Sequence, residues 1–241
     1  MKSFKFILAV SIISIFIQSC RKGILWGITG KGSNITEVRA ASGYNSIQLS
    51  IDADVSYTQD SVYYLEISAQ PNIMKVLATE VNGSELKIDF KRNVWKHHTV
   101  KITVHSPNMN KLGISGSGDI AVSNAIKTSD MSLSISGSGD ISIPSLIAET
   151  LTAKISGSGN ITVSDGKINS EELSISGSGN IKTDNAVCNN NTSKISGSGD
   201  ISLYATENLN ISISGSGDIR YRGQPAVSSK ISGSGSLIHI N

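Results

Sequence analysis

The sequence lacks an excess of charge of either sign. Its 241 residues include 21 Lys and Arg against 19 Asp and Glu, which gives a formal net charge of +2. Phosphate binding needs a concentrated basic face, and these charges are spread along the chain, so we expect no nucleic-acid partner. The one basic cluster, residues 91–98, is more typical of an exposed loop than of a polyanion site.

The sequence also lacks helical periodicity after its N-terminal segment. Apolar residues alternate with polar ones instead, as in "IQLSIDADVSY" at residues 47–57, and this period of two is typical of a strand with one buried face. The pattern recurs around Leu65, Leu86 and Val100, and Asn82-Gly83 is a turn signal. We therefore predict an all-β protein.

Cysteine is scarce, with Cys20 and Cys188 as the 2 copies in the chain. The start, "MKSFKFILAVSIISIFIQSC", places lysines before an apolar run that is too short to span a bilayer and is typical of an export signal. Residues 17–20 resemble a bacterial lipobox. We predict a lipoprotein signal peptide at residues 1–19 and lipidation of Cys20, with a plain secretory signal or an uncleaved anchor as the alternative. Cys188 then has no disulfide partner, and we expect it to be buried.

Glycine and serine, by contrast, are abundant in a repeated motif. The sequence Ile-Ser-Gly-Ser-Gly followed by Asp, Asn or Ser occurs seven times, at steps of 18 to 21 residues. A nearly fixed period of this length is typical of a stacked array, in which each unit buries its apolar face against the next. The copies begin at Ile114, Ile135, Ile155, Ile175, Ile195, Ile213 and Ile231.

The spacers between the copies are too short for a helix and its turns, so parallel strands must be joined by winding the chain as a coil. We predict a right-handed single-stranded parallel β-helix, a β-solenoid with about 20 residues per rung. Residues 113–241 form the repeat region, and residues 46–112 form its β-strand-rich N-terminal part. Residues 20–45 hold the lipidated cysteine, a tether and a first imperfect unit, "GITGKGSNIT".

The glycines of the motif are expected at one corner of every rung, where positive φ and the close approach of the next rung exclude a Cβ. They are Gly116, Gly118, Gly137, Gly139, Gly157, Gly159, Gly177, Gly179, Gly197, Gly199, Gly215, Gly217, Gly233 and Gly235. The residue after each motif is expected to stack on the outer face as a ladder, here called the Asp/Asn ladder: Asp119, Asp140, Asn160, Asn180, Asp200, Asp218 and Ser236.

The Asp/Asn ladder is the sharpest candidate for a site. If the rungs register, Asp119 with Asp140 and Asp200 with Asp218 lie about 5 Å apart, and a weakly bound Ca²⁺ would relieve their repulsion. The alternative is structural, because Asp and Asn favour tight turns and bond to nearby backbone. We expect no dedicated metal site and no cofactor.

The repeated "ISGSG[DN]I" series, preceded by a β-patterned half and an export signal, resembles the putative auto-transporter adhesin head GIN domain family of Bacteroidetes. The resemblance covers residues 27 to 240 and implies a parallel β-helix on a cell-envelope lipoprotein, without a set of catalytic residues. Lipoproteins displayed on the surface in that phylum tend to carry acidic residues after the cysteine, whereas Arg21-Lys22-Gly23 follows here. Both the outer surface and the periplasmic face of the outer membrane therefore stay open.

Catalytic constellations are weak in this sequence. The histidines, His97, His98, His105 and His239, have no evident Ser and Asp partners, and "GSGDI" lacks the lysine of a phosphate loop. Glu171 with Glu172, or Glu149 with Asp140, would be the carboxylate pairs of a polysaccharide-cleaving enzyme, but the short spacers build no cleft for one. We predict that the protein is not an enzyme.

The predicted function is that of a non-catalytic, adhesin-like or scaffolding module that binds a protein or glycan ligand by extended surface contacts. A periplasm-facing structural lipoprotein and a polysaccharide-binding or polysaccharide-processing protein are the alternatives. Tyr63, Tyr64 and Trp95 are the candidates for an exposed aromatic patch, with core or capping roles as the alternative. Because the C-terminal "SGSGSLIHIN" has no evident cap, we also expect a homo-oligomer formed end to end or side by side.

Overall fold

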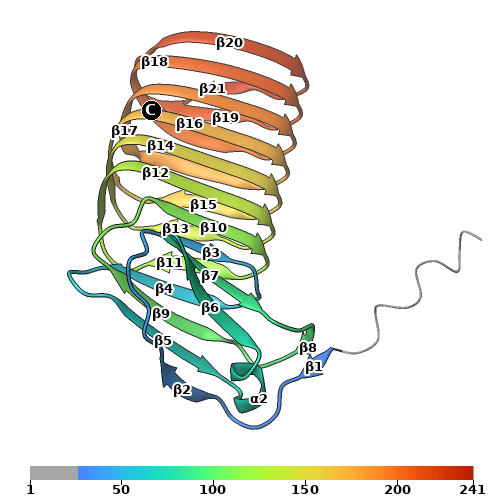
Figure 1. Cartoon of the computed structure of the whole chain (residues 1–241). Helices are drawn as coiled ribbons and strands as arrows, with labels where there is room; N and C mark the ends of the chain where they lie inside the picture. Colours follow the sequence, from blue (N-terminus) through green and yellow to red (C-terminus); the bar gives the residue numbers. More distant parts are fainter. Residues whose placement is uncertain (1–26, 241) are drawn as a thin grey trace, which may run out of the picture.

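The computed structural model describes residues 27–240, so the predicted signal peptide and Cys20 lie outside the described residues. These residues wind into a β-solenoid of about six turns, with roughly 20 residues per turn (Figure 1). The helix among them is the short α2 (Pro71–Met74). The predictions of an all-β chain and of a solenoid with this period are therefore confirmed. Within the described part of the chain, no helix has the length and apolarity to cross a membrane.

Each turn of the repeat consists of one long strand that ends at the first motif glycine and one short strand that follows the corner. The long strands are β12 (Ile126–Gly137), β14 (Leu146–Gly157), β16 (Gly166–Gly177), β17 (Asn180–Gly197), β18 (Ile201–Gly215) and β20 (Ala226–Gly233). The short strands are β11 (Asp119–Val122), β13 (Ile141–Ile143), β15 (Asn160–Val163), β19 (Ile219–Arg222) and β21 (Leu237–His239), while β17 and β18 each include the short strand of their turn. Successive turns pair in parallel, so each turn forms one rung of the stack.

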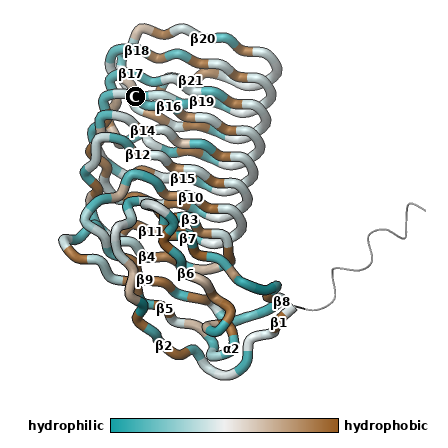
Figure 2. The backbone as a smooth tube through the Cα atoms, viewed as in Figure 1, coloured by the Kyte–Doolittle hydropathy of each residue, from teal (hydrophilic) through white to brown (hydrophobic). Residues whose placement is uncertain are grey.

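The rungs stack in register, motif upon motif. Ile135 pairs with Ile155, which pairs with Ile175, and the same alignment runs through all seven copies. Figure 2 shows hydrophobic and hydrophilic residues alternating along each coil, which sends the aliphatic side chains inward and the hydroxyl-bearing ones outward. The stack therefore buries one continuous core, and Cys188 lies in it, completely buried as expected.

The parallel stack continues into the N-terminal half of the chain. β10 (Lys111–Gly116) pairs with β3 (Ser46–Leu49), and β3 pairs with β7 (Glu85–Phe90), while β11 pairs with β4 (Asp54–Gln59), and β4 pairs with β9 (Lys101–Ser106). The alternating pattern of residues 47–57 thus supplies two strands of the stack, with Tyr57 fully buried at its inner face.

The N-terminal end of the solenoid is closed by antiparallel strands. β5 (Tyr64–Ala69) pairs antiparallel with β9 and with β2 (Ile35–Val38), and β6 (Leu77–Asn82) forms a hairpin with β7 across the Asn82-Gly83 turn. A separate sheet joins β1 (Ile28–Thr29) to β8 (Val94–Lys96). We call residues 27–109 the N-terminal region; it lies at the end of the molecule opposite to β20 (Figure 1).

The segment expected to hold a first imperfect unit is arranged differently from the repeat. Its residues form β1 and β2, whose partners β8 and β5 belong to the N-terminal region and not to a motif rung. Gly27 packs on Trp95 and Gly30 packs on Gln70, so neither glycine lies over another glycine corner. The sequence likeness of "GITGKGSNIT" to the motif therefore reflects tight packing of glycines, without the stacking that the repeat provides.

Candidate binding surfaces

The glycine corner of each rung is a tight contact between neighbouring backbones. The first motif glycine has positive φ, from 120° to 150° over the seven copies. From the second copy onward, a Cβ on the second glycine would lie about 2 Å from the carbonyl oxygen of the glycine one rung earlier, as at Gly159, where the distance to Gly139 O would be 2.0 Å. Both glycines are therefore required by packing between rungs, and this corner has no room for a ligand.

The Asp/Asn ladder lies beside that corner, and its oxygens bond to the next rung. Asp119 Oδ1 accepts a hydrogen bond from the Asp140 backbone N–H at 2.8 Å, and Asp140 Oδ1 accepts one from the Asn160 N–H at 2.8 Å. Asn180, Asp200 and Asp218 accept equivalent bonds from the backbone N–H groups of Asp200, Asp218 and Ser236 at 2.9 to 3.2 Å. The ladder thus satisfies backbone donors at the corners, which is a structural role.

The carboxylates of the ladder also have a partner that sequence reasoning missed. Arg220 lies between two rungs and donates from Nη1 to Asp200 Oδ2 at 3.0 Å and from Nη2 to Asp218 Oδ2 at 3.2 Å. Its guanidinium relieves the repulsion between these two carboxylates, so this pair does not need a bound Ca²⁺. Over residues 27–240, the structure has no group of three or more His, Cys, Asp or Glu side chains suited to a metal ion.

Substitution of Asp140 separates the structural role of the ladder from cation binding. Asp140→Ala should lower the free energy of unfolding by about 1 kcal/mol, because it removes the acceptor for both the Asn160 N–H and the Asn160 Nδ2. Asp140→Asn keeps an acceptor and should be nearly neutral. Urea unfolding with and without millimolar Ca²⁺ measures both effects. A stabilisation by Ca²⁺ that Asp140→Asn abolishes would instead establish a cation site.

The first carboxylate pair considered for glycoside cleavage, Glu171 with Glu172, does not form one site. Glu171 and Glu172 are consecutive on β16 and point to opposite faces: Glu171 is 2% exposed in the core, whereas Glu172 is exposed and lies 3.5 Å from Lys154. Burial raises the pKa of Glu171 to about 7, and the polar side chains of Asn191 and Thr183 offset this rise in part. The burial of Glu171 could have been predicted from sequence, because it occupies an inward position in the alternating pattern of its strand.

The histidine with an acidic neighbour is His105, whose Nδ1 lies 3.2 Å from Asp60 Oδ2. Ser61 donates to the same carboxylate, through its backbone N–H at 2.6 Å and its hydroxyl at 3.3 Å. These bonds, first that of the Ser61 N–H and then that of His105, lower the pKa of Asp60. In a catalytic triad the imidazole lies between the hydroxyl and the carboxylate, whereas here the carboxylate lies between them.

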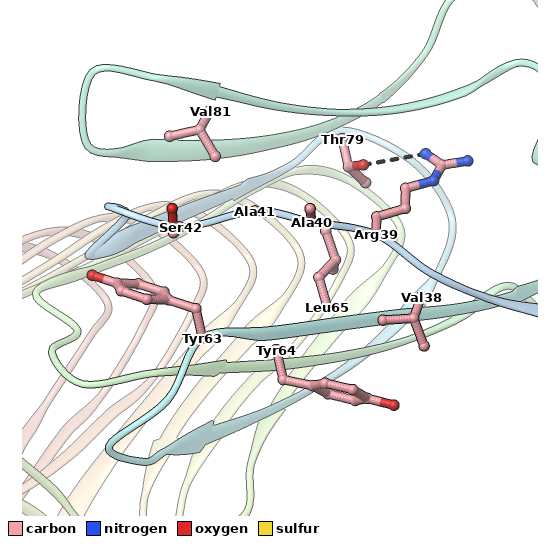
Figure 3. Close-up of a pocket in the computed structure, with 10 residues that line it drawn as sticks. All are labelled: Val38, Arg39, Ala40, Ala41, Ser42, Tyr63, Tyr64, Leu65, Thr79 and Val81. Atoms are coloured by element: carbon pink, nitrogen blue, oxygen red, sulfur yellow. Dashed lines mark hydrogen bonds between the residues drawn. The ribbon is translucent and has the colours of Figure 1, made fainter.

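A groove of about 830 Å³ runs between residues 38–42 and strand β6 in the N-terminal region (Figure 3). Tyr63 lies along it with 39% of its surface exposed, and its ring packs edge-on against that of Tyr44 at 5.0 Å. Val38 and Val81 add apolar surface to the lining. Tyr64 also lines the groove, but its hydroxyl is bonded to Glu66 at 2.7 Å.

Arg39 closes one end of this groove by bonding to backbone across it. Its guanidinium donates to Leu77 O at 2.9 Å, to Met74 O at 3.1 Å and to Thr79 Oγ1 at 3.2 Å, and its Nε pairs with Glu37 at 2.7 Å. Figure 3 shows the side chain of Arg39 directed to Thr79, away from Tyr63. The cation is thus engaged by the fold, and the groove along Tyr63 is mainly an apolar and aromatic surface.

A second groove, of about 450 Å³, lies beside Trp95 on β8. Trp95 is 66% exposed, more than any other large apolar side chain among the described residues, and β1 holds its strand by parallel pairing at Val94 and Lys96. The other lining residues are mostly polar or charged and include Asp52, Arg92 and Asn93. Of the predicted aromatic patch, Tyr63 and Trp95 are thus at the surface, each beside its own groove.

These observations define a class of protein: a β-solenoid in which the motif residues bond to and pack on neighbouring rungs. Its exposed aromatic side chains, Tyr63 and Trp95, and its larger grooves lie at the N-terminal end. The chain matches the model of the family described as "Putative auto-transporter adhesin, head GIN domain" over residues 43–225. It belongs to this family, as the ISGSG series indicated.

Solved structures of relatives agree with this assignment. A putative adhesin from Bacteroides fragilis NCTC 9343 aligns with 27% identity and a TM-score of 0.84, over 89% of this chain and 100% of that chain. A putative lipid binding protein from Parabacteroides distasonis ATCC 8503 aligns with 29% identity and a TM-score of 0.72, over 90% of this chain and 100% of that chain.

A putative adhesin from Parabacteroides merdae ATCC 43184 shares the fold, with 21% identity and a TM-score of 0.73 over 89% of this chain and 99% of that chain. No match was found among curated proteins. The relatives are thus described as adhesin-like or lipid-binding proteins, which agrees with an adhesin-like module, and the family points to the cell envelope.

Proposed function

We propose that the protein is a non-catalytic, adhesin-like module of the bacterial envelope, anchored by lipid at Cys20, and that it binds its ligand through the N-terminal region. The observation that carries this proposal is the placement of Trp95, which is 66% exposed beside a groove of about 450 Å³ lined by charged and amide side chains. Binding sites combine an apolar or aromatic surface with a few convergent polar groups, and an exposed Trp supplies large contact area at low entropic cost.

The repeats offer a less suitable binding surface, which also favours the N-terminal region as the ligand site. The Asp/Asn ladder and the glycine corners are engaged in rung-to-rung bonds, so their polar groups are only partly available to a ligand. A flat array of hydroxyl groups offers many weak contacts and no anchor, whereas binding energy usually concentrates in a few aromatic or Arg anchors. We therefore place the ligand at Trp95 and assign no ligand contact to the repeats.

Removal of the Trp95 side chain tests this proposal. Trp95→Ala should weaken binding to a glycan or matrix-protein array by at least about tenfold, because hot-spot aromatics contribute roughly 2 kcal/mol or more. Its thermal stability should stay close to that of the wild type, since the side chain is largely exposed. Ser158→Ala, an exposed substitution on the repeats, is the matched control. Equal binding by Trp95→Ala and the wild type would reject Trp95 as the anchor.

A lipid ligand is the second candidate function, because of the groove at Tyr63. Its volume of about 830 Å³ lies within the usual range for small-molecule sites, and a relative with 29% identity is described as a putative lipid binding protein. Titration of the purified protein with a fluorescent fatty acid tests this candidate. Tyr63→Ser should reduce saturable binding while Trp95→Ala leaves it unchanged, and the absence of saturable binding would reject it.

The side of the membrane that the protein faces needs a test of its own. Protease treatment of intact cells, with Cys20→Ala as the control for anchoring, should digest the protein without lysis if it is displayed outside. Protection until lysis would exclude an extracellular adhesin and favour the periplasm-facing structural lipoprotein.

A further inference from the structure

The C-terminal rung exposes residues that every earlier rung buries. The motif isoleucine is 1% to 2% exposed at Ile114, Ile135, Ile155, Ile175, Ile195 and Ile213, yet Ile231 is 42% exposed. Val227 is also 42% exposed, whereas Leu209, its partner one rung earlier, is fully buried. All eight residues of β20 are exposed. The last rung therefore leaves the apolar interior of the solenoid exposed at this end.

The backbone edge of β20 is open as well. Within residues 27–240, β20 pairs on one side with β18 and has no strand on its other side. The Ser234 N–H bonds to Gly215 O, and alternate residues of a strand direct their peptide groups to opposite sides. Val227, Ser229 and Ile231 thus direct theirs away from β18. An unpaired edge of this kind is a template for strand addition.

The opposite end of the solenoid offers no matching rung. There the stack ends in the antiparallel strands β5 and β2 and in α2, and β2 is only four residues long. A head-to-tail contact would set a parallel rung against these antiparallel strands. Among the described residues, the surface that matches the C-terminal rung in length and apolar pattern is the C-terminal rung of a second copy.

We infer that two copies of the chain associate tip to tip, with β20 of one copy pairing antiparallel with β20 of the other about a two-fold axis at Ser229. In this register Val227 lies opposite Ile231 of the second copy, so the inward apolar side chains form one layer of a core that continues through both copies. Ser228 lies opposite Lys230 of the second copy, which keeps the two lysines from facing each other directly.

The same register gives hydrogen-bond partners to the unpaired peptide groups of the open edge. Val227, Ser229 and Ile231, the residues whose peptide groups point away from β18, become the hydrogen-bonded pairs of the new antiparallel ladder. A one-residue slip would instead set inward residues opposite outward ones and leave these donors unpaired. Isologous contacts of this kind close at a dimer and form no fibre.

The role of the dimer rests on the proposed function, in which Cys20 is anchored to the membrane. The C-terminal rung is then the tip of the rod, because β1 lies at the opposite end (Figure 1). A tip-to-tip dimer places its two N-terminal regions at opposite ends. Such a dimer would join two facing membrane surfaces. The self-association itself is tested in solution, so it can succeed or fail independently of the binding to glycans or matrix proteins.

The first test measures the mass of the mature chain carrying Cys20→Ala by sedimentation at micromolar concentrations. We expect a monomer–dimer equilibrium, and the double substitution Val227→Lys with Ile231→Lys should weaken it at least about tenfold, because charges at an open edge oppose strand addition. Ile147→Lys, at a side chain that is 46% exposed on the flank of the rod, is the control and should dimerise like the wild type. A wild-type monomer throughout, or equal dimerisation of the edge variant, would overturn the inference.

The second test measures the register. In an antiparallel hydrogen-bonded pair the Cα atoms are about 5.5 Å apart, within the range that a disulfide bridges. Ser229→Cys should therefore form a covalent dimer on mild oxidation, whereas Ser228→Cys, displaced from its own copy along the strand, should not. Cys188 is fully buried and should not interfere. Equal cross-linking of both variants, or cross-linking of Ser228→Cys alone, would overturn the proposed register.

Discussion

Replacing Gly159 by alanine should destabilise the solenoid by roughly 3 kcal/mol or more, one of the largest effects expected of any single methyl group in this chain. The added Cβ would lie 2.0 Å from Gly139 O and 3.0 Å from Ile135 Cγ2. Both atoms belong to the rung below, whose backbone is fixed by the next rung in turn. The clash therefore cannot be relieved by rotating one side chain and must separate two rungs.

Gly83→Ala is the matched control for this prediction. Gly83 has positive φ, +62°, but nothing lies within 4 Å of the added Cβ, so only backbone strain of about 1 kcal/mol is expected. Urea unfolding followed by circular dichroism measures both variants. A loss at Gly159→Ala no larger than that at Gly83→Ala would contradict the stacking contact described above, because Gly159, unlike Gly83, has no positive φ.

The stack was predictable from sequence because its causes are local and repeated. Each copy of the motif carries its own evidence: two glycines that a neighbouring rung requires, an aliphatic residue at alternate positions, and an oxygen acceptor after the corner. The seven copies at nearly constant spacing then fix which residue lies over which, as the register of Ile135 on Ile155 shows. Repetition thus replaced the long-range information that a single copy would lack.

The N-terminal region was not predictable in the same way. Its strands show the same alternation, but alternation does not say whether a strand pairs parallel, as β3 does, or antiparallel, as β5 does. Arg220 was missed for a related reason: it follows its ladder residue by two positions, and only the stacking of rungs brings it to both Asp200 and Asp218. Long-range pairing and charge placement depend on tertiary geometry.

The stability of the protein should fall as the pH rises from about 4.5 to about 7, because of Glu171. Its pKa is raised from 4.5 to about 7 in the folded chain, chiefly by burial. Between these values the unfolded chain loses a proton that the folded chain retains, so the unfolded state gains stability over the folded state as the pH increases. At about 1.4 kcal/mol per pKa unit, the loss should reach roughly 3 kcal/mol above pH 7 and be absent below pH 4.

The surroundings of Glu171 explain why the protonated form is preferred. Asn191, which pairs with it one rung later, donates to Glu171 Oε2 at 2.8 Å, and Ser193 donates in turn to Asn191 Oδ1 at 2.7 Å. Glu171 Oε1 is buried and has no hydrogen-bond partner of good geometry, and neither has Thr183 Oγ1. One side of the carboxylate is thus unsolvated, and ionisation there is costly.

Glu171→Gln should remove this dependence on pH. The amide keeps an oxygen for Asn191 but cannot ionise, so the variant should match the wild type near pH 4 and exceed its stability by roughly 3 kcal/mol at pH 8. Glu172→Gln, next in sequence but exposed beside Lys154, is the control and should follow the wild-type curve. Urea unfolding across this pH range compares the three proteins. If the stability difference between Glu171→Gln and the wild type were the same at every pH, the pKa of Glu171 would not be raised in the folded chain, and the burial argument would be wrong.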